Sequence, residues 1–293
     1  MTGGAGFLGG WVIGRLLDGG HEIRVFDRGE ERGVLRELLG ERADELEWMV
    51  GDVAEADDVT RAVNGCDHAV HLAALLTPAC QADPVLGARV NLIGTLNVFE
   101  AALRHGLRGV AYASSAGVYG ADGDPTPRPD THYGAFKLAT EGCARAYWAD
   151  HGLPSVGLRP FVVYGPGRET GLTADASLAC RAAVRGQPYV IGFTGSCDFV
   201  FVDDVAAAFE AAVLRPPESA HAFNPFGQVA TVDELIAAIR RHEPGAALSA
   251  EGGPLPVQGP LPADDLDRVF PDLPHTGLDD GLERTIEHYR RTG

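Results

Sequence analysis

Short apolar segments alternate with longer amphipathic stretches over the first two thirds of the chain. In residues 21–27, Ile23 and Val25 alternate with Glu22 and Arg24, which predicts a β-strand. Similar patterns predict strands at residues 47–50, 68–72, 109–114 and 155–163, and helices at residues 91–105 and 133–151. Strands and helices at this spacing are joined by right-handed crossovers, so we expect an α/β fold with a doubly wound, Rossmann-like parallel sheet.

The start of the chain lacks one element of this pattern. A doubly wound sheet has a buried apolar strand directly before its first glycine turn. Here only Met1 precedes Thr2-Gly3-Gly4. We therefore expect a first strand that is missing or truncated, either because the true start lies upstream or because the strand was lost. The sheet would then have a gap in its middle.

The regular pattern loosens after residue 165. Proline and glycine accumulate between Pro244 and Pro274, which is typical of loops and short elements. We predict that residues 1–165 form a nucleotide-binding domain. Residues 166–293 are expected to form a smaller C-terminal substrate lobe that is partly interleaved with the first domain.

Charge and composition exclude several classes of partner. The 293 residues carry a formal net charge of −17, and the arginines are scattered. Nucleic acids and anionic membranes are bound by clustered basic residues, so neither is expected as a partner. No apolar run approaches the ~18 residues that a membrane span requires. Five widely spaced cysteines without a CxxC pair indicate reduced thiols, a cytoplasmic protein and no metal site. We interpret His68 and His71, which lie in or beside an apolar run, as strand residues.

The glycine-rich start indicates a dinucleotide site. Glycines at positions 3, 6 and 9 permit a tight turn and let the backbone approach a pyrophosphate at the N-terminus of the next helix. Asp27 ends the following strand, where its carboxylate can accept hydrogen bonds from ribose hydroxyls and repel a 2′-phosphate. We therefore expect NAD rather than NADP, although the neighbouring Arg28 is a cation. Asp52 ends the next strand and is expected beside the adenine.

One lysine stands apart from the other basic residues. Of the 24 lysines and arginines only Lys137 is a lysine, and it follows Tyr133 by four residues, on one face of a predicted helix. Oxidation of a secondary alcohol requires a base, but a phenol has a pKa near ~10 and is mostly protonated at neutral pH. An ammonium ~4 Å away supplies ~4 kcal/mol, enough to lower that pKa by about three units. We expect Lys137 to lower the pKa of Tyr133, with Tyr133 as catalytic base.

Several motifs occur together in one order. They are Thr2-Gly3-x-x-Gly6-x-x-Gly9, Asp27, Asp52-Val53, His71-Leu72-Ala73-Ala74, Asn91, residues 114–120, Tyr133-x-x-x-Lys137, residues 159–166 and residues 199–205. In this order the chain resembles the extended short-chain dehydrogenase/reductase family, specifically its NAD-dependent epimerase/dehydratase group.

The resemblance assigns roles to particular residues. It implies that Ser115 holds the substrate oxygen and that Lys137 bonds the nicotinamide ribose. It also implies a homodimer formed through the helices at residues 91–105 and 133–151. Cofactor contacts are expected from Gly3, Gly6, Phe7, Leu8, Asp27, Arg28, Asp52, Val53, Leu72, Ala73, Asn91, Tyr133, Lys137 and Pro160.

The residues after Ser115 discriminate between branches of this family. Family dehydratases and decarboxylases carry carboxylate residues there, whereas this chain has Ala116 and Gly117, which cannot transfer a proton. Elimination and decarboxylation are therefore disfavoured. What remains is simple oxidation or reduction, or epimerisation through a transient ketone.

The substrate end departs from the nucleotide-sugar pattern. Val162 and Cys197 stand where family members that bind nucleoside-diphosphate sugars typically carry an asparagine and often an arginine. A buried diphosphate without cationic partners is costly, although Arg168, Arg181 and Arg185 could compensate from new positions. A free sugar, sugar acid or other polyol is therefore as well supported as a nucleotide sugar.

Three functions remain open. The first is an NAD-dependent dehydrogenase of a small hydroxylated substrate. The second is a nucleoside-diphosphate-sugar epimerase that holds its NAD tightly. The third is a non-catalytic dinucleotide-sensing protein, against which the intact Ser115, Tyr133 and Lys137 argue.

Overall fold

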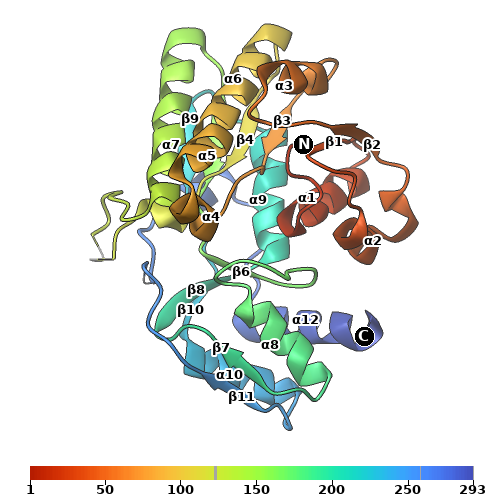
Figure 1. The fold of residues 1–293 in the computed structure, drawn as a ribbon, viewed down its shortest axis with the longest axis vertical. Coiled ribbons are helices and arrows are strands. Elements are labelled where there is room, and N and C mark those ends of the chain that lie inside the picture. Colours follow the sequence, from red (N-terminus) through yellow and green to blue (C-terminus); the bar gives the residue numbers. More distant parts are fainter. Residues whose placement is uncertain (122–123, 258, 293) are drawn as a thin grey trace.

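An all-parallel β-sheet lies at the centre of the larger lobe, in the upper part of Figure 1. The computed structural model describes residues 1–121, 124–257 and 259–292. The sheet consists, in spatial order, of β2 (Glu47–Val50), β1 (Arg24–Asp27), Thr2, β3 (Ala69–His71), β4 (Val110–Ala113), β5 (Ser155–Leu158) and β9 (Ala220–Phe223). The predicted α/β class with a Rossmann-like parallel sheet is confirmed.

The two halves of this sheet are joined by Thr2, which forms parallel bridges both to Phe26 of β1 and to His71 of β3. The Met1 nitrogen beside it donates to Arg24 O. Next to Met1, a cavity of about 730 Å³ lies among Ile23, Arg24, His68 and Val70.

Helices cover both faces of the sheet (Figure 1). On one face α1 (Phe7–Asp18) packs against α2 (Gly33–Leu39) and α9 (Val202–Leu214). On the other, α6 (Gly94–His105) packs between α3 (Ala56–Val63) and α7 (His132–His151). The helix predicted over residues 91–105 thus begins at Gly94. A π-helical turn, Arg89–Ile93, and the short helices α4 (Thr77–Ala82) and α5 (Pro84–Ala88) precede it.

The smaller lobe contains two further sheets. In the first, β8 (Ser196–Phe201) pairs parallel with β6 (Val162–Tyr164) and antiparallel with β10 (Gln228–Thr231). In the second, β7 (Tyr189–Ile191) pairs with β11 (Leu248–Ala250). The helices of this lobe are α8 (Asp175–Val184), α10 (Val232–His242), α11 (Leu266–Val269) and α12 (Leu278–Thr292).

The single strand predicted over residues 155–163 is wrong. The chain leaves β5 at Leu158 and enters β6 at Val162, in the sheet of the other lobe. Pro160 has no N–H to give to a sheet ladder, and the Arg159 side chain is held in an ion pair with Glu141. The apolar run therefore continues while the backbone changes sheets.

The lobes are interleaved along the chain. After β8 of the smaller lobe, α9 returns to the first sheet and packs on α1, and β9 then pairs with β5. Within the described ranges, none of the helices has the length and apolarity required to cross a bilayer. All five cysteines carry free thiols.

Candidate active site

A cavity of about 610 Å³ is lined by residues of both lobes. Its walls include the glycine turn before α1, the end of β4 and the first turns of α7, together with segments 167–173 and 255–257. The predicted site residues that line this cavity are Gly3, Gly6, Phe7, Leu8, Leu72, Ser115, Tyr133, Lys137 and Pro160.

The glycine turn presents an anion-binding helix terminus to this cavity. Gly3 has a φ of +67°, and a Cβ there would lie 2.6 Å from the Ala73 nitrogen, so another residue would not fit. Gly6 is the N-cap of α1 and gives no side-chain hydrogen bond, and the first turn contains no acidic residue. The first N–H groups of α1, from Phe7 and Leu8, therefore remain available for an anion. This end of α1 fits the pyrophosphate of a dinucleotide.

Asp27 lies beside the glycine turn. Its Oδ2 accepts a hydrogen bond from Ala5 N at 3.1 Å, and its Oδ1 accepts one from Arg28 N at 2.8 Å. The carboxylate is therefore fixed at the carboxyl end of β1, whereas the Arg28 side chain is exposed. The expected contact of Asp27 with the ribose stays a prediction.

Besides Asp27 and Arg28, four predicted cofactor residues do not line the cavity. They are Asp52, Val53, Ala73 and Asn91. Asn91 is buried, and its amide donates to Leu75 O and accepts from Leu75 N, each at 2.8 Å. It thus holds the loop after β3, whose Leu72, Ala74 and Leu76 do line the cavity. Asp52 Oδ1 accepts from Ala54 N within its own turn. Direct cofactor contacts by these four residues stay predictions.

Tyr133 and Lys137 share one face of α7, and Tyr133 lines the cavity together with Ser115. Gly134 makes this possible, because a Cβ at that position would overlap the carbonyl oxygen of Gly117. The close approach brings the first turn of α7 against the short 3-10 helix η3 (Ala116–Val118). The Lys137 Nζ lies 5.7 Å from the centre of the Tyr133 ring and donates to Ala113 O at 2.6 Å.

The electrostatics of this pair differ from the expectation. Burial raises the pKa of Tyr133, against the opposing effects of the Ser115 hydrogen bond and the Arg168 charge. Burial also lowers the pKa of Lys137 to about 8. Because the ammonium lies over the ring and bonds Ala113 O, the predicted lowering of the Tyr133 pKa by Lys137 is not found.

His71 has the structural role that its apolar surroundings indicated. It is buried in β3, with Nδ1 2.7 Å from Thr2 Oγ1 and Nε2 2.9 Å from Thr95 Oγ1. Desolvation lowers its pKa to about 3, so the ring is neutral at physiological pH. His71 therefore fastens the bridging residue Thr2 to α6.

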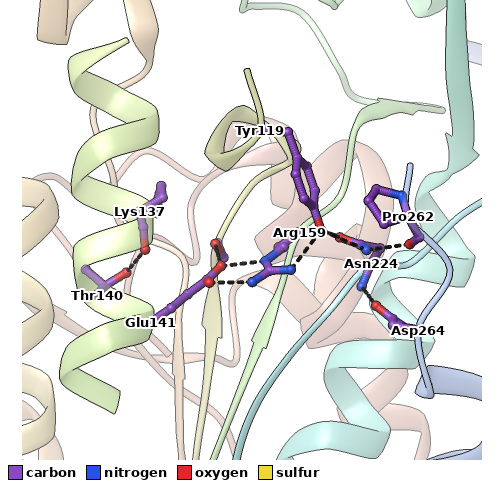
Figure 2. Close-up of polar contacts among 9 residues, drawn as sticks. Tyr119, Lys137, Thr140, Glu141, Arg159, Asn224, Pro262 and Asp264 are labelled. Carbon is purple, nitrogen blue, oxygen red and sulfur yellow. Dashed lines mark hydrogen bonds and ion pairs between the residues drawn. The ribbon is translucent and has the colours of Figure 1, made fainter. Parts of the chain in front are cut away.

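A buried polar network behind the site was not predicted. Glu141, one turn after Lys137 on α7, accepts two hydrogen bonds from Arg159, as Figure 2 shows. Arg159 also donates to Tyr119 Oη at 2.8 Å, and Asn224 Nδ2 donates to the same oxygen at 3.1 Å. The network continues from Asn224 to Pro262 O and to Asp264, and Ser114 Oγ donates to Glu141. It joins α7 to the smaller lobe directly beside the residues that line the cavity.

The structure also separates the three arginines that could have replaced missing cationic partners. Arg168 lines the cavity. Arg181 pairs with Glu169, and Arg185 is exposed at the end of α8. Val162 and Cys197 are fully buried in the core of the smaller lobe. Composition alone could not identify Arg168, because it is one arginine among 23.

Known proteins resemble this chain over almost its whole length. A UDP-glucose 4-epimerase from Mycolicibacterium smegmatis is 30% identical, over 99% of this chain and 97% of its own length. The solved structure of Thermus thermophilus UDP-glucose 4-epimerase in complex with NAD has a TM-score of 0.82 at 27% identity, over 99% of this chain and 97% of the other. A uronate dehydrogenase from Pseudomonas syringae is 32% identical over 54% of this chain and 57% of its own length.

The family assignment rests on the longest match. The sequence pattern of the NAD dependent epimerase/dehydratase family matches residues 1–224, which include the glycine turn, Ser115, Tyr133 and Lys137. This range also includes the strands and helices that build the cavity. The chain therefore belongs to the NAD dependent epimerase/dehydratase family, whose cofactor is NAD.

Proposed function

We propose that this protein is an NAD-dependent dehydrogenase that acts on a secondary alcohol of a sugar or sugar-like small molecule. The observation that carries the proposal is that Ser115 and Tyr133 line the same cavity as the uncapped N-terminus of α1. A phenol, a hydroxyl and a dinucleotide-binding helix terminus together meet the requirements of alcohol oxidation.

Each residue of the site has a distinct role in this proposal. NAD, when bound, supplies the acceptor for the hydrogen that leaves the alcohol carbon with its electron pair. Ser115 Oγ holds the alcohol oxygen, and Tyr133 takes the hydroxyl proton. Since burial raises the pKa of Tyr133, the phenol is protonated when no cofactor is bound. The positively charged nicotinamide of bound NAD would favour the phenolate, which is the form that takes the hydroxyl proton.

The groups proposed to hold the cofactor come from the larger lobe. The N–H groups of Phe7 and Leu8 face the pyrophosphate, and Asp27 accepts from the ribose of the adenosine half. Lys137, fixed by Ala113 O, holds the ribose next to the nicotinamide. Pro160 and Leu72 close the cavity around the reacting end.

A nucleoside-diphosphate-sugar epimerase is the second candidate. It is favoured by the likeness to UDP-glucose 4-epimerases over nearly the full chain. The dehydrogenase is preferred because Val162 and Cys197 occupy two positions where a diphosphate would find polar or cationic partners, and both are buried in the core. The likeness to a uronate dehydrogenase also supports simple oxidation.

One experiment separates the candidates. The purified protein is incubated with NAD and a panel of free sugars, uronates, aldonates and nucleotide sugars, while NADH absorbance and product NMR are recorded. A dehydrogenase produces NADH stoichiometrically with oxidised substrate. A product without net NADH would identify an epimerase and contradict the proposal, and so would tight NAD binding with no turnover of any substrate.

We also propose that the protein is a homodimer formed on the side of α7. Val85, Leu86 and Ile93 lie near one another in sequence on α5 and the following π-helical turn, and they are 71%, 46% and 44% exposed. Both elements pack beside α7. Exposed apolar side chains so close together mark a surface for a second chain. Light scattering after gel filtration measures the mass, and a monomer at micromolar concentration would contradict this proposal.

A further inference from the structure

Arg168 is a cation in the wall of the cavity without an anionic partner. Its Nη1 donates to Val163 O at 2.7 Å and its Nη2 donates to Thr173 Oγ1 at 2.8 Å. Its guanidinium carbon lies 5.6 Å from the centre of the Phe7 ring. No carboxylate in the described part of the chain forms an ion pair with it, and its Nε has no hydrogen-bond partner. The adjacent Glu169 is directed to Arg181 instead.

An unpaired guanidinium in such a position is costly. The group has five N–H donors, and the two hydrogen bonds to neutral oxygens use only two of them. Withdrawal from water penalises the cation and lowers the pKa of Arg168 to about 10. A desolvated charge that the protein leaves unpaired is offset when a ligand brings the opposite charge.

The position of Arg168 places that ligand in the active site. Ser115, Tyr133 and Arg168 all line one cavity, and the Arg168 charge acts on the Tyr133 phenol. The other cation of this cavity, among the described residues, is Lys137, whose ammonium is bound to Ala113 O. Arg168 is therefore the cation left for the substrate. One planar guanidinium matches one carboxylate, whereas a diphosphate with two charges calls for more.

We propose that Arg168 binds the carboxylate of the substrate, so that the substrate is a sugar acid or a related polyhydroxy acid. The inference rests on the proposed function, because it requires the alcohol of the same molecule to reach Ser115 and Tyr133. In the reaction the alcohol carbon loses its hydrogen with two electrons to NAD, and the hydroxyl proton passes to Tyr133. The carboxylate takes no part in the bond changes. Its ion pair with Arg168 orients the alcohol.

The test compares matched substrates that differ only in the carboxylate, such as a uronate and the corresponding aldose. Wild-type holoenzyme is expected to prefer the acid in kcat/KM. In the Arg168→Gln variant, kcat/KM for the acid falls by ~30-fold or more, while that for the aldose changes by less than ~3-fold. Arg168→Lys retains a charge without the planar fork, so its kcat/KM for the acid is expected to lie between those of the wild type and Arg168→Gln. Arg185→Gln, which removes an exposed arginine at the end of α8 outside the cavity, leaves both values unchanged.

A binding measurement keeps this test independent of turnover. Calorimetric titration of Tyr133→Phe holoenzyme with the acid reports recognition without reaction, and Tyr133→Phe/Arg168→Gln is expected to bind the acid at least ~30-fold more weakly. Binding of NAD alone is expected to be the same in both proteins. Thermal unfolding establishes that each variant is folded, and Arg168→Lys replaces Arg168→Gln in the titration if the latter is unfolded.

Three results would overturn the inference. Equal loss of NAD binding and of both activities in Arg168→Gln would show that the anion is the pyrophosphate of the cofactor. Equal use of acid and aldose by the wild-type enzyme, or a preference for a nucleotide sugar that depends on Arg168, would also reject the carboxylate. Retained activity of Tyr133→Phe contradicts the proposed function; the comparison of acid and aldose in Arg168→Gln then still tests the role of Arg168.

Discussion

Arg159 and Glu141 form a bidentate ion pair, with Nε to Oε1 at 2.7 Å and Nη2 to Oε2 at 2.5 Å. The Glu141 side chain is 1% exposed and that of Arg159 13%. The pair joins the helix that carries Tyr133 and Lys137 to the junction of the two lobes, as Figure 2 shows. The position of the catalytic helix therefore depends on a contact outside the cavity.

Removal of one charge from this pair should be strongly destabilising. Glu141→Gln leaves the Arg159 guanidinium buried and unpaired, and we expect a loss of ~3 to 5 kcal/mol in the free energy of unfolding. Urea unfolding measures it. Arg268→Gln, which breaks the exposed pair of Arg268 and Asp265, is the control and should leave the free energy of unfolding nearly unchanged. Similar losses in the two variants would contradict a structural role for the buried pair.

Tyr133→Phe should abolish turnover and preserve cofactor binding. The change removes the group that exchanges the hydroxyl proton, so kcat is expected to fall by at least ~10²-fold. Tyr147→Phe is the matched control on the same helix, because Tyr147 Oη bonds Glu100 and does not line the cavity. Rates are measured by NADH absorbance and NAD binding by calorimetry. A near-normal rate in Tyr133→Phe would remove the phenol from the mechanism.

Lys137→Met should make the protein more stable and inactive. The folded pKa of Lys137, about 8, lies below its ordinary value of 10.5, so the buried ammonium costs ~3 kcal/mol at pH 7. Loss of the hydrogen bond from Lys137 to Ala113 O costs ~1 kcal/mol, which offsets part of the stability gained when the ammonium is removed.

The stability difference between Lys137→Met and the wild type should depend on pH. Between pH 8 and 10.5 the unfolded chain binds more protons at position 137 than the folded one, so wild-type stability rises with pH. The stability advantage of Lys137→Met is therefore largest below pH 8 and shrinks by pH 9.5. Chemical denaturation at pH 7 and 9.5 measures it, and an advantage that is constant with pH would refute the assignment.

His71 should make the protein sensitive to acid. Its folded pKa of about 3 lies below the ordinary value of 6.5, so the unfolded state binds the proton first. Stability is expected to fall as the pH decreases from 6.5 towards 3, with ~2 kcal/mol of the loss reached by pH 5. His71→Gln cannot titrate and should lose less stability than the wild type between pH 7 and pH 5. Equal losses in the two proteins, by urea unfolding, would exclude His71 as the cause.

The succession of strands up to β5 and a minority of the cavity lining could be predicted from the sequence, through local patterns and the family resemblance. Glycine spacing located the turn before α1, and helical spacing placed Tyr133 and Lys137 on one face. The break between β5 and β6 could not be predicted, because Arg159-Pro160 interrupts an apolar run without ending it. Side-chain partners could not be predicted either, since Tyr119 and Asn224 lie 105 positions apart and a local pattern does not connect them.

The error in the Tyr133 pKa has a different cause. Spacing placed Lys137 near the phenol, but the direction of its ammonium is decided by Ala113 O, which comes from another strand. Desolvation is the largest effect on both groups and raises the pKa of Tyr133 while it lowers that of Lys137. Distance along a helix therefore predicted proximity without predicting the sign of the electrostatic effect.

The return of α9 and β9 to the first sheet limits how such an enzyme can be recombined. A fragment cut at residue 165 would expose the face of α1 that α9 covers and would end its sheet at β5, so we do not expect it to fold alone. Exchange of the substrate-binding part with that of a relative requires several simultaneous junctions. New specificity in this architecture is therefore more accessible through point substitutions in the cavity wall than through transfer of whole modules.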